Sequence, residues 1–299
     1  MGLFGPMTGG KVGLALVANY VSTSWAISRS VCTAPTAMAT TDRLFRSIEL
    51  KEQERHAPNC ATSWGRVLDA GTGDHSLNWL KSLPIDSIVA VTGDIARSVS
   101  LRKTFPEKHI EILAGNWNNP SFLEGQVFDV VIADYLVGAI EGHAPYYQDQ
   151  IFHRLFPHVA DGGRLYIVGL QPIMMSLDPS KTKSNQEKLV LEMQRVRDAC
   201  ILLAGHRPYR EFPLDWILRQ AVQAGFYVES HTTFANKYSA SMIMRQIAVG
   251  RNKLSLFLDQ SVAKSMESYL ANLDKQAVDA TKDGSFEFGY DYVVTALKP

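Results

Sequence analysis

Residues 66–75 read Arg-Val-Leu-Asp-Ala-Gly-Thr-Gly-Asp-His, and this stretch decides the predicted fold. A short apolar run, Val67-Leu68, leads into an acidic residue and two closely spaced glycines, and a helical pattern begins at Ser76. Glycine allows the chain to turn sharply and leaves room for a ligand beside the backbone. A strand, a glycine turn and a helix in this order are typical of nucleotide-binding sites. The alternative is an ordinary strand–turn–helix without a ligand.

The spacing of the glycines separates two classes of nucleotide-binding protein. Dinucleotide oxidoreductases carry G-x-G-x-x-G, and here Ser76 stands in place of the third glycine. The run Asp69-Ala-Gly71-Thr-Gly73 resembles instead the first motif of the Rossmann-like (class I) S-adenosylmethionine (SAM) methyltransferases, which have an acidic residue at the strand end followed by x-G-x-G. That family often has a further glycine where this chain has His75.

The composition is that of a globular protein without a dominant charge. Of 299 residues, 46% are hydrophobic and 20% are charged, and 30 Lys and Arg balance 30 Asp and Glu. The neutral balance provides no electrostatic footprint for nucleic acid. Three scattered cysteines, Cys32, Cys60 and Cys200, form neither a disulfide framework nor a metal motif, so we expect a reducing compartment and no metal.

The first 41 residues differ from the rest of the chain. They contain no Asp or Glu and are rich in Ser and Thr, which is typical of a targeting segment, although an N-terminal arm fits equally well. The apolar run 12–21 is too short for a stable membrane span. We therefore predict a leader at 1–41 and one domain at 42–299, located in the cytoplasm or, if the leader is a targeting peptide, in an organelle.

From residue 66 onward, short apolar runs alternate with helical patterns, which predicts an α/β fold with a mostly parallel, doubly wound sheet. The strands are expected at 66–69, 87–92, 110–113, 128–133, 163–169, 226–233 and 290–297. The helices are expected at 75–83, 95–105, 146–156, 186–204, 214–224 and over most of 240–280. The long helical segments within 172–215 and 239–282 are expected to form lid insertions over the site.

Further segments resemble the same methyltransferase family, in the order in which the family has them. They are Val91-Thr-Gly-Asp94, Ala114-Gly-Asn-Trp117, Phe128-Asp-Val-Val-Ile-Ala-Asp-Tyr135, His158-Val-Ala-Asp-Gly-Gly-Arg-Leu-Tyr166, Ala224-Gly-Phe226 and Tyr292-Val-Val-Thr-Ala296. The resemblance covers roughly residues 60–299 and implies a seven-stranded sheet whose last strand is antiparallel. Segments 133–138 and 196–207 also resemble algal, especially diatom, methyltransferase-like proteins, which indicates no particular substrate.

The resemblance implies a cofactor, SAM, and residues that bind it. Asp94 corresponds to the acid that holds the ribose hydroxyls, and Asn116 stands where the family commonly has an aspartate near the adenine. The cofactor residues expected on this basis are Asp69, Gly71, Thr72, Gly73, Asp94, Asn116, Trp117 and Asp134.

Substrate-binding groups are expected beyond the carboxyl ends of the strands. Asp134 and Tyr135 end the fourth expected strand, and Asp134 is a candidate to orient or deprotonate the acceptor, or else only to cap a turn. Arg207 and Arg210 are candidates to bind a small anionic group, and His206 is a candidate base near neutral pH. The alternative is a surface ion-pair cluster with Glu211.

These observations predict a SAM-dependent methyltransferase acting on a small polar metabolite, with transfer to oxygen, nitrogen or sulfur. The expected partner is this small-molecule substrate, not nucleic acid, and the sequence leaves the oligomeric state open. A non-catalytic SAM-binding protein is the first alternative, and a nucleotide-dependent oxidoreductase is the second.

Overall fold

The computed structural model describes residues 42–56, 63–173 and 184–299, and all of them belong to one compact unit. The predicted leader, residues 1–41, lies outside the described residues. None of the described helices is long and apolar enough to cross a membrane.

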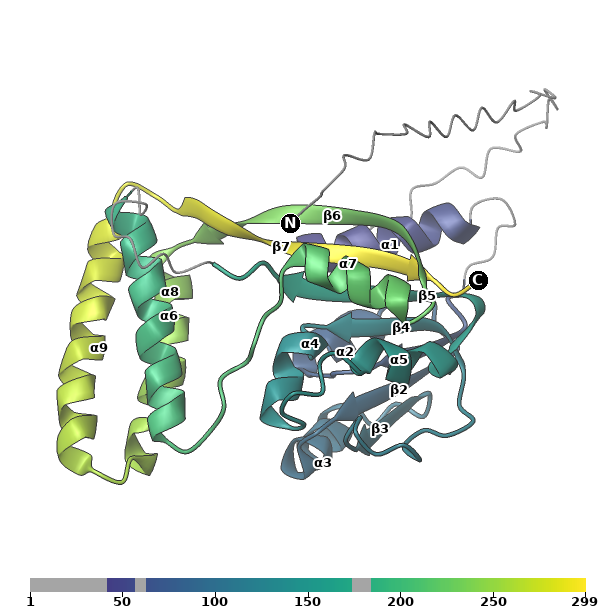
Figure 1. The fold of residues 1–299 in the computed structure, drawn as a ribbon, viewed down its shortest axis with the longest axis horizontal. Helices are drawn as coiled ribbons and strands as arrows, with labels where there is room; N and C mark the ends of the chain where they lie inside the picture. The colour runs from purple at the N-terminus through teal and green to yellow at the C-terminus, as the bar shows by residue number, and fades with distance from the viewer. Residues whose placement is uncertain (1–41, 57–62, 174–183) are drawn as a thin grey trace, which may run out of the picture. The chain divides into compact units, whose positions relative to one another are not determined.

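A seven-stranded sheet with the order β3-β2-β1-β4-β5-β7-β6 runs through the unit (Figure 1). The five strands β1–β5 pair in parallel, and β7 pairs antiparallel with both β5 and β6. This confirms the predicted mostly parallel sheet with an antiparallel last strand. The strands are β1 (Arg66–Asp69), β2 (Ser87–Thr92), β3 (Ile110–Ala114), β4 (Phe128–Asp134), β5 (Val159–Leu170), β6 (Tyr227–Tyr238) and β7 (Phe286–Leu297).

Helices cover both faces of the sheet, as a doubly wound fold requires. One apolar cluster joins α1, α2 and α3 to the sheet, and a second cluster joins α4, α5 and α7 to its other face. The helices are α1 (Arg43–His56), α2 (Asp74–Leu80), α3 (Ile95–Thr104), α4 (Leu136–Ala139), α5 (Ile151–Leu155), α6 (Asn185–Leu203), α7 (Leu214–Gln223), α8 (Ala240–Arg251) and α9 (Gln260–Ala280).

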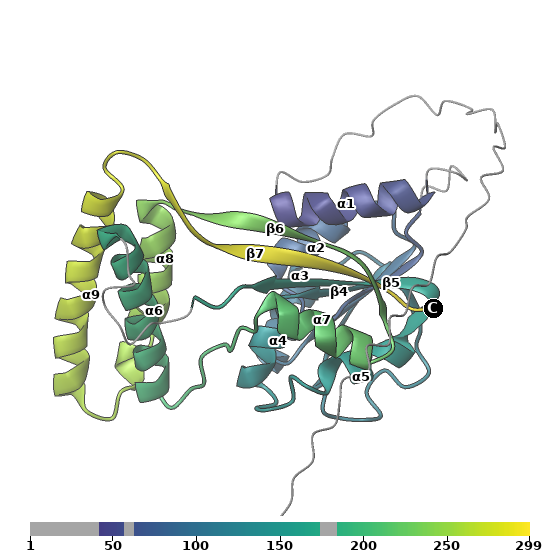
Figure 2. The same ribbon diagram turned by 45° about the horizontal axis from the view of Figure 1, so that its top comes forward.

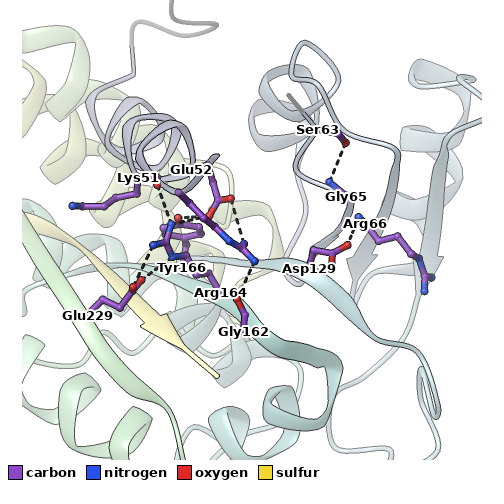
Figure 3. A network of polar contacts seen from close by, with 11 residues as sticks. Lys51, Glu52, Ser63, Gly65, Arg66, Asp129, Gly162, Arg164, Tyr166 and Glu229 are labelled. Carbon is purple, nitrogen blue, oxygen red and sulfur yellow. Dashed lines mark hydrogen bonds and ion pairs between the residues drawn. The ribbon is translucent and has the colours of Figure 1, made fainter. Parts of the chain in front are cut away.

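Helix α1 was not among the expected elements, yet it is part of the core. Phe45 is 1% exposed and stacks on Trp79 of α2 with 4.1 Å between ring centroids. The fully buried Glu52 accepts a 2.6 Å hydrogen bond from the Tyr166 hydroxyl of β5 (Figure 3). Arg164 of β5 extends this network to Glu229 of β6, with an Nε–Oε2 distance of 2.7 Å. Buried carboxylates need such partners, so the network fixes α1 on the sheet.

Helices α6, α8 and α9 form a separate helical insertion with its own apolar cluster. In the sequence, α6 lies between β5 and β6, and α8 and α9 lie between β6 and β7. In space, the three helices lie together beyond the ends of the long strands β6 and β7 (Figures 1 and 2). Gly250 of α8 allows close packing, because a Cβ there would lie 3.3 Å from the Arg197 Cα of α6. The predicted helical insertions are thus present, and their role as a lid over the site stays a prediction.

Two of the expected helices differ from the structure. The helix expected at 146–156 is reduced to α5, which a 3-10 turn, Phe156–His158, follows. Tyr146 itself cannot be part of a right-handed helix, because its φ is 68°. The segment expected to be mostly helical at 240–280 is divided into α8 and α9 by a short 3-10 turn, Leu254–Leu256. Asp259 ends this break by accepting a hydrogen bond from the Ser261 N–H at the start of α9.

Candidate functional site

A hydrogen-bond network that begins at the buried Asp69 carboxylate supports the glycine turn after β1. This carboxylate is completely buried and accepts a 2.7 Å hydrogen bond from the Ser76 hydroxyl. The same hydroxyl accepts a hydrogen bond from the Gly73 N–H at 3.1 Å. Burial raises the pKa of Asp69 to about 6, although its hydrogen bonds partly oppose that shift. Asp69 therefore stabilises the turn through Ser76. Ser76, the residue in place of a third glycine, has a structural role in the turn.

The turn borders a pocket at the carboxyl ends of β1, β2, β3 and β4. Its wall includes Gly71 and Thr72 after β1, Gly93 after β2, and Asn116 after β3. The far side is formed by residues that follow β4: Leu136, Ala139, Ile140, His143 and Ala144. A crevice outside the carboxyl ends of parallel strands is the usual ligand position in this class of sheet.

The structure brings Gly71, Thr72, Asn116 and Trp117 together in this pocket, as the sequence predicts. Trp117 is buried, and its indole N–H donates a 2.8 Å hydrogen bond to the Ala70 carbonyl, which ties the loop after β3 to the glycine turn. Asn116 donates a 2.8 Å hydrogen bond to the His143 carbonyl. The amide expected near an adenine thus also joins the two sides of the pocket.

Gly73 and Asp94 are the chain neighbours of the pocket-lining residues Thr72 and Gly93, but they do not line the pocket themselves. A Cβ on Gly73 would meet no atom within 4 Å, and its extended backbone (φ −145°) suits any residue. Asp94 is exposed beside Gly93 and caps α3, where its Oδ1 accepts a hydrogen bond from the Arg97 N–H at 3.0 Å. Both residues lie where the resemblance places them, at the ends of β1 and β2.

Asp134 and Tyr135 lie at the carboxyl end of β4, half-buried. Burial, assisted by Asp69, Asp42 and Asp291, raises the pKa of Asp134 to about 7. Its Oδ1 is shielded from solvent and has no hydrogen-bond partner among the described residues. Tyr135 has a left-handed backbone (φ 48°), rare for a tyrosine, and its hydroxyl hydrogen bonds to Asp291. Strained residues of this kind gather at functional sites.

The segment 206–210 is not arranged as the sequence suggests. His206 lies 3.1 Å from Lys253 Nζ, measured from its Nδ1, and Arg210 is exposed. Arg207 forms an ion pair with the buried Glu141 and stacks over the Tyr146 ring, rather than pairing with Glu211. Of this segment, only Tyr209 borders the pocket. The segment therefore does form an ion pair, but Arg207 pairs with Glu141 and not with Glu211.

Sequence reasoning missed Glu211 and Asp291 as residues of the site. Glu211 is half-buried and lies in the chain segment that connects α6 to α7. Its side chain contacts Gly138 of α4, where an added Cβ would come within 2.6 Å of Glu211 Oε1. Burial, together with the charge of Asp291, raises the pKa of Glu211 to about 7, against the lowering effect of a hydrogen bond from Leu170. Burial also raises the pKa of Asp291 on β7. Neither residue stands in a motif, so only folding brings them beside Asp134.

His143, which follows β4 and could from the sequence be either a pocket residue or a solvated loop histidine, is part of the pocket wall. Its ring lies against Gly93, where a Cβ would come within 2.6 Å of Nδ1. Within the described part of the chain, no group of three or more His, Cys, Asp or Glu side chains is placed to hold a metal ion.

Comparisons with known proteins identify the fold. No protein-family model and no curated protein matches the chain. Among solved structures, a Bacillus halodurans protein assigned provisionally as a methyltransferase covers 84% of this chain and 99% of its own, with a TM-score of 0.51 and 13% identity. The chain thus has the fold of the class I methyltransferases.

Two further solved structures are more distantly similar. A mycolic acid cyclopropane synthase, complexed with S-adenosylhomocysteine (SAH), has a TM-score of 0.46 and 14% identity, and the match covers 77% of this chain and 76% of that one. A phosphoethanolamine N-methyltransferase from Haemonchus contortus, also bound to SAH, has a TM-score of 0.43 and 15% identity, with coverage of 85% and 52%.

Proposed function

We propose that this protein is a SAM-dependent methyltransferase that acts on a small polar metabolite. The observation that carries the proposal is the pocket at the carboxyl ends of β1–β4, bordered by the glycine turn, in a sheet of order β3-β2-β1-β4-β5-β7-β6. A dinucleotide-binding sheet of the usual oxidoreductase kind has the order 3-2-1-4-5-6 without the inserted antiparallel strand. Both the glycine spacing and the strand order therefore favour SAM over a nicotinamide dinucleotide.

The residues present suit SAM in shape and in chemistry. Gly71–Gly73 provide backbone that a ligand can approach closely, and Gly73 faces open space. We assign the ribose to Asp94, the adenine to the wall formed by Asn116 and His143, and the methionine part to the turn near Asp134. When bound, SAM supplies an activated methyl group, so the protein mainly has to orient the acceptor and exclude water.

We propose a small-molecule substrate and no nucleic acid partner, because the overall charge is neutral. The location is proposed as cytoplasmic, or an organelle if residues 1–41 act as a targeting peptide. The likeness to algal methyltransferase-like proteins rests on the two sequence segments alone.

Calorimetric titration of the full chain tests the proposal. We expect SAM and SAH to bind and NAD not to bind. Binding of NAD without SAM would favour the oxidoreductase alternative.

A second measurement separates an enzyme from a non-catalytic SAM-binding protein. Labelled methyl groups from SAM should appear in a fraction of a metabolite extract when the protein is added. Tight SAM binding without transfer to any fraction would support the non-catalytic alternative, for which the departure from the family pattern at His75 is the motivation.

A further inference from the structure

Three carboxyl groups from distant parts of the chain lie near the neighbouring ends of β4 and β5, where Asp134 is opposite Val168 and Asp291 is opposite Leu170. Asp134 ends β4, Glu211 lies in the segment between α6 and α7, and Asp291 lies on β7. Each is half-buried, and the charges of Asp134 and Glu211 are both coupled to that of Asp291. We call these three residues, with Tyr135, whose hydroxyl bonds to Asp291, the acidic face.

The acidic face is not neutralised by basic side chains. Among the described residues, no Lys or Arg forms an ion pair with Asp134, Glu211 or Asp291. Arg43, which acts on Asp291 electrostatically, donates its hydrogen bond to the Ala235 carbonyl instead. Arg197, which acts on Glu211, is bonded to Asp198 and Gln246. The nearby cations therefore leave these carboxyl groups without a counter-ion, and their pKa values are raised by burial and by one another; a bound cation would favour their ionised forms.

Asp134 gives an independent sign that a ligand donor belongs here. Its Oδ1 is shielded from water and accepts no hydrogen bond from any described residue. A buried carboxylate oxygen without a donor is unfavourable, and native structures seldom leave one unexplained. An N–H group on a bound molecule would satisfy it.

Glu211 and Asp291 are held in place in a way that suits a binding face. The Glu211 carboxylate rests on Gly138, where any larger residue would collide with it, and it accepts a hydrogen bond from the Leu170 N–H. Asp291 is bonded by Tyr135 and by the Asn236 amide at 3.4 Å. Fixed carboxylates beside an aromatic ring attract a cation strongly, because little reorganisation is needed on binding.

We propose that the methyl-acceptor substrate is a small molecule bearing an amine, bound as its ammonium cation near Asp134, Glu211 and Asp291. Where this nitrogen is the acceptor, it first gives a proton to one of these carboxylates; its lone pair then forms the bond to the methyl carbon as the S–C bond of SAM breaks and SAH leaves. This inference rests on the proposed function and replaces the small anion that the sequence suggested. The arginine expected to bind that anion, Arg207, is already paired with Glu141. The competing explanation is that the acidic face serves only the positive charges of SAM itself.

The experiment uses the full chain saturated with SAH and matched sets of probes. Each set contains a primary amine, an alcohol and a carboxylate that share one hydrocarbon group, from ethyl to phenethyl. Binding is measured by calorimetry, and methyl transfer from labelled SAM is measured in parallel. We expect the best amine to bind at least tenfold more tightly than its alcohol and carboxylate counterparts.

Substitutions then locate the binding site. Glu211→Gln and Asp291→Asn preserve side-chain shape and remove charge, and each should weaken amine binding at least tenfold while the Kd for SAH changes less than threefold. Glu211→Asp, which keeps the charge, should retain part of the amine preference. Glu287→Gln is the matched control, because this carboxylate lies on the same strand but is exposed and pairs with Lys237. It should leave amine binding unchanged.

The outcomes distinguish this inference from the proposed function. Failure of SAH and SAM to bind at all would reject the proposed function, whereas an amine preference in direct titration would still support the acidic face. If SAH binds but no amine is preferred or methylated, the inference is wrong. It is also wrong if Glu211→Gln leaves amine binding intact, or if both variants weaken SAH as much as the amine, since the face would then serve the cofactor.

Discussion

At the scale of single residues, the two glycines of the turn have different surroundings, although the sequence motif treats them alike. Gly71 lies against α4, because a Cβ there would come within 3.1 Å of a Leu136 methyl group. Gly73 faces open space in a backbone conformation open to all residues. A side chain at Gly71 would thus require Leu136 to shift, although Gly71 itself lines the pocket, whereas a side chain at Gly73 would meet no other part of the described protein.

We predict that Gly73→Val folds normally but binds SAH at least tenfold more weakly, which corresponds to about 1.4 kcal/mol. The added side chain enters space that the proposed ligand requires, and the thermal transition should shift little. Gly71→Val should instead lower the melting temperature, because it collides with Leu136. Calorimetry and thermal unfolding separate the two, and unchanged SAH affinity in folded Gly73→Val would contradict this site.

Asp134 provides a pH-dependent test at the same scale. Its pKa of about 7 in the folded protein exceeds the value of about 3.9 for an unfolded aspartate. Between these values the folded state holds a proton that the unfolded chain has lost, so the free energy of unfolding falls as the pH rises through this window.

We predict that Asp134→Asn flattens this dependence. The loss of stability between pH 5.5 and pH 8 should be smaller than in the wild type by at least about 1 kcal/mol, as expected for a shift of one pKa unit or more. Denaturant unfolding at the two pH values measures it. Asp283→Asn, at an exposed position, is the control, and equal slopes in Asp134→Asn and the wild type would show that Asp134 does not titrate in this way.

At the scale of elements, α1 is the helix on which the first sheet face depends. Its apolar residues are few, but Phe45 and Ile48 are buried against α2 and the sheet, and Glu49 accepts a 2.8 Å hydrogen bond from the Trp79 indole. The helix also begins near the glycine turn, since Asp42, just before its first residue, lies 3.0 Å from His75 Nε2. Its position therefore links the core to the side of the site.

We predict that Phe45→Ala lowers the free energy of unfolding by about 3–5 kcal/mol, as removal of a buried aromatic ring does. Denaturant titration measures the loss, and Leu50→Ala on the exposed side of the same helix should change stability by less than about 0.5 kcal/mol. A similar small effect from both substitutions would mean that α1 is not part of the stable core.

At the scale of the whole molecule, the described residues form one compact unit in which the site draws on β1–β4, α1, β7 and the segment before α7. Ligand binding at such a site should stabilise the unit as a whole. A ligand at a hundred times its Kd adds about 2.7 kcal/mol to the free energy of unfolding.

We predict that a chain beginning at Asp42 folds cooperatively and retains this stabilisation. Its melting temperature should match that of the full chain, and saturating SAH should raise it by roughly 5–10 °C. A chain beginning at Ser63 lacks α1 and should lose the cooperative transition. Loss of that transition in the longer truncated chain would show that residues 1–41 are needed for folding.

The sequence by itself determined where along the chain the strands occur, the glycine turn and the class of pocket, although β5 and β7 begin four residues earlier and β6 ends five residues later than expected. These features depend on local patterns: a buried strand such as β4 is a continuous apolar run, and a turn needs glycine at fixed positions. The strands 66–69 and 87–92 coincide with β1 and β2, and Asn116 and Trp117 lie in the pocket wall.

Only the tertiary structure decided which charged groups meet. Arg207 pairs with Glu141 rather than with the nearby Glu211, and Glu211 lies close enough to Asp291, far along the chain, for that charge to raise its pKa. Helix α1 carries too few apolar residues to stand out by pattern, and it is fixed by contacts with Trp79 and Tyr166. A charged side chain takes the partner that folding brings within a few ångströms, and sequence spacing carries no information about that approach.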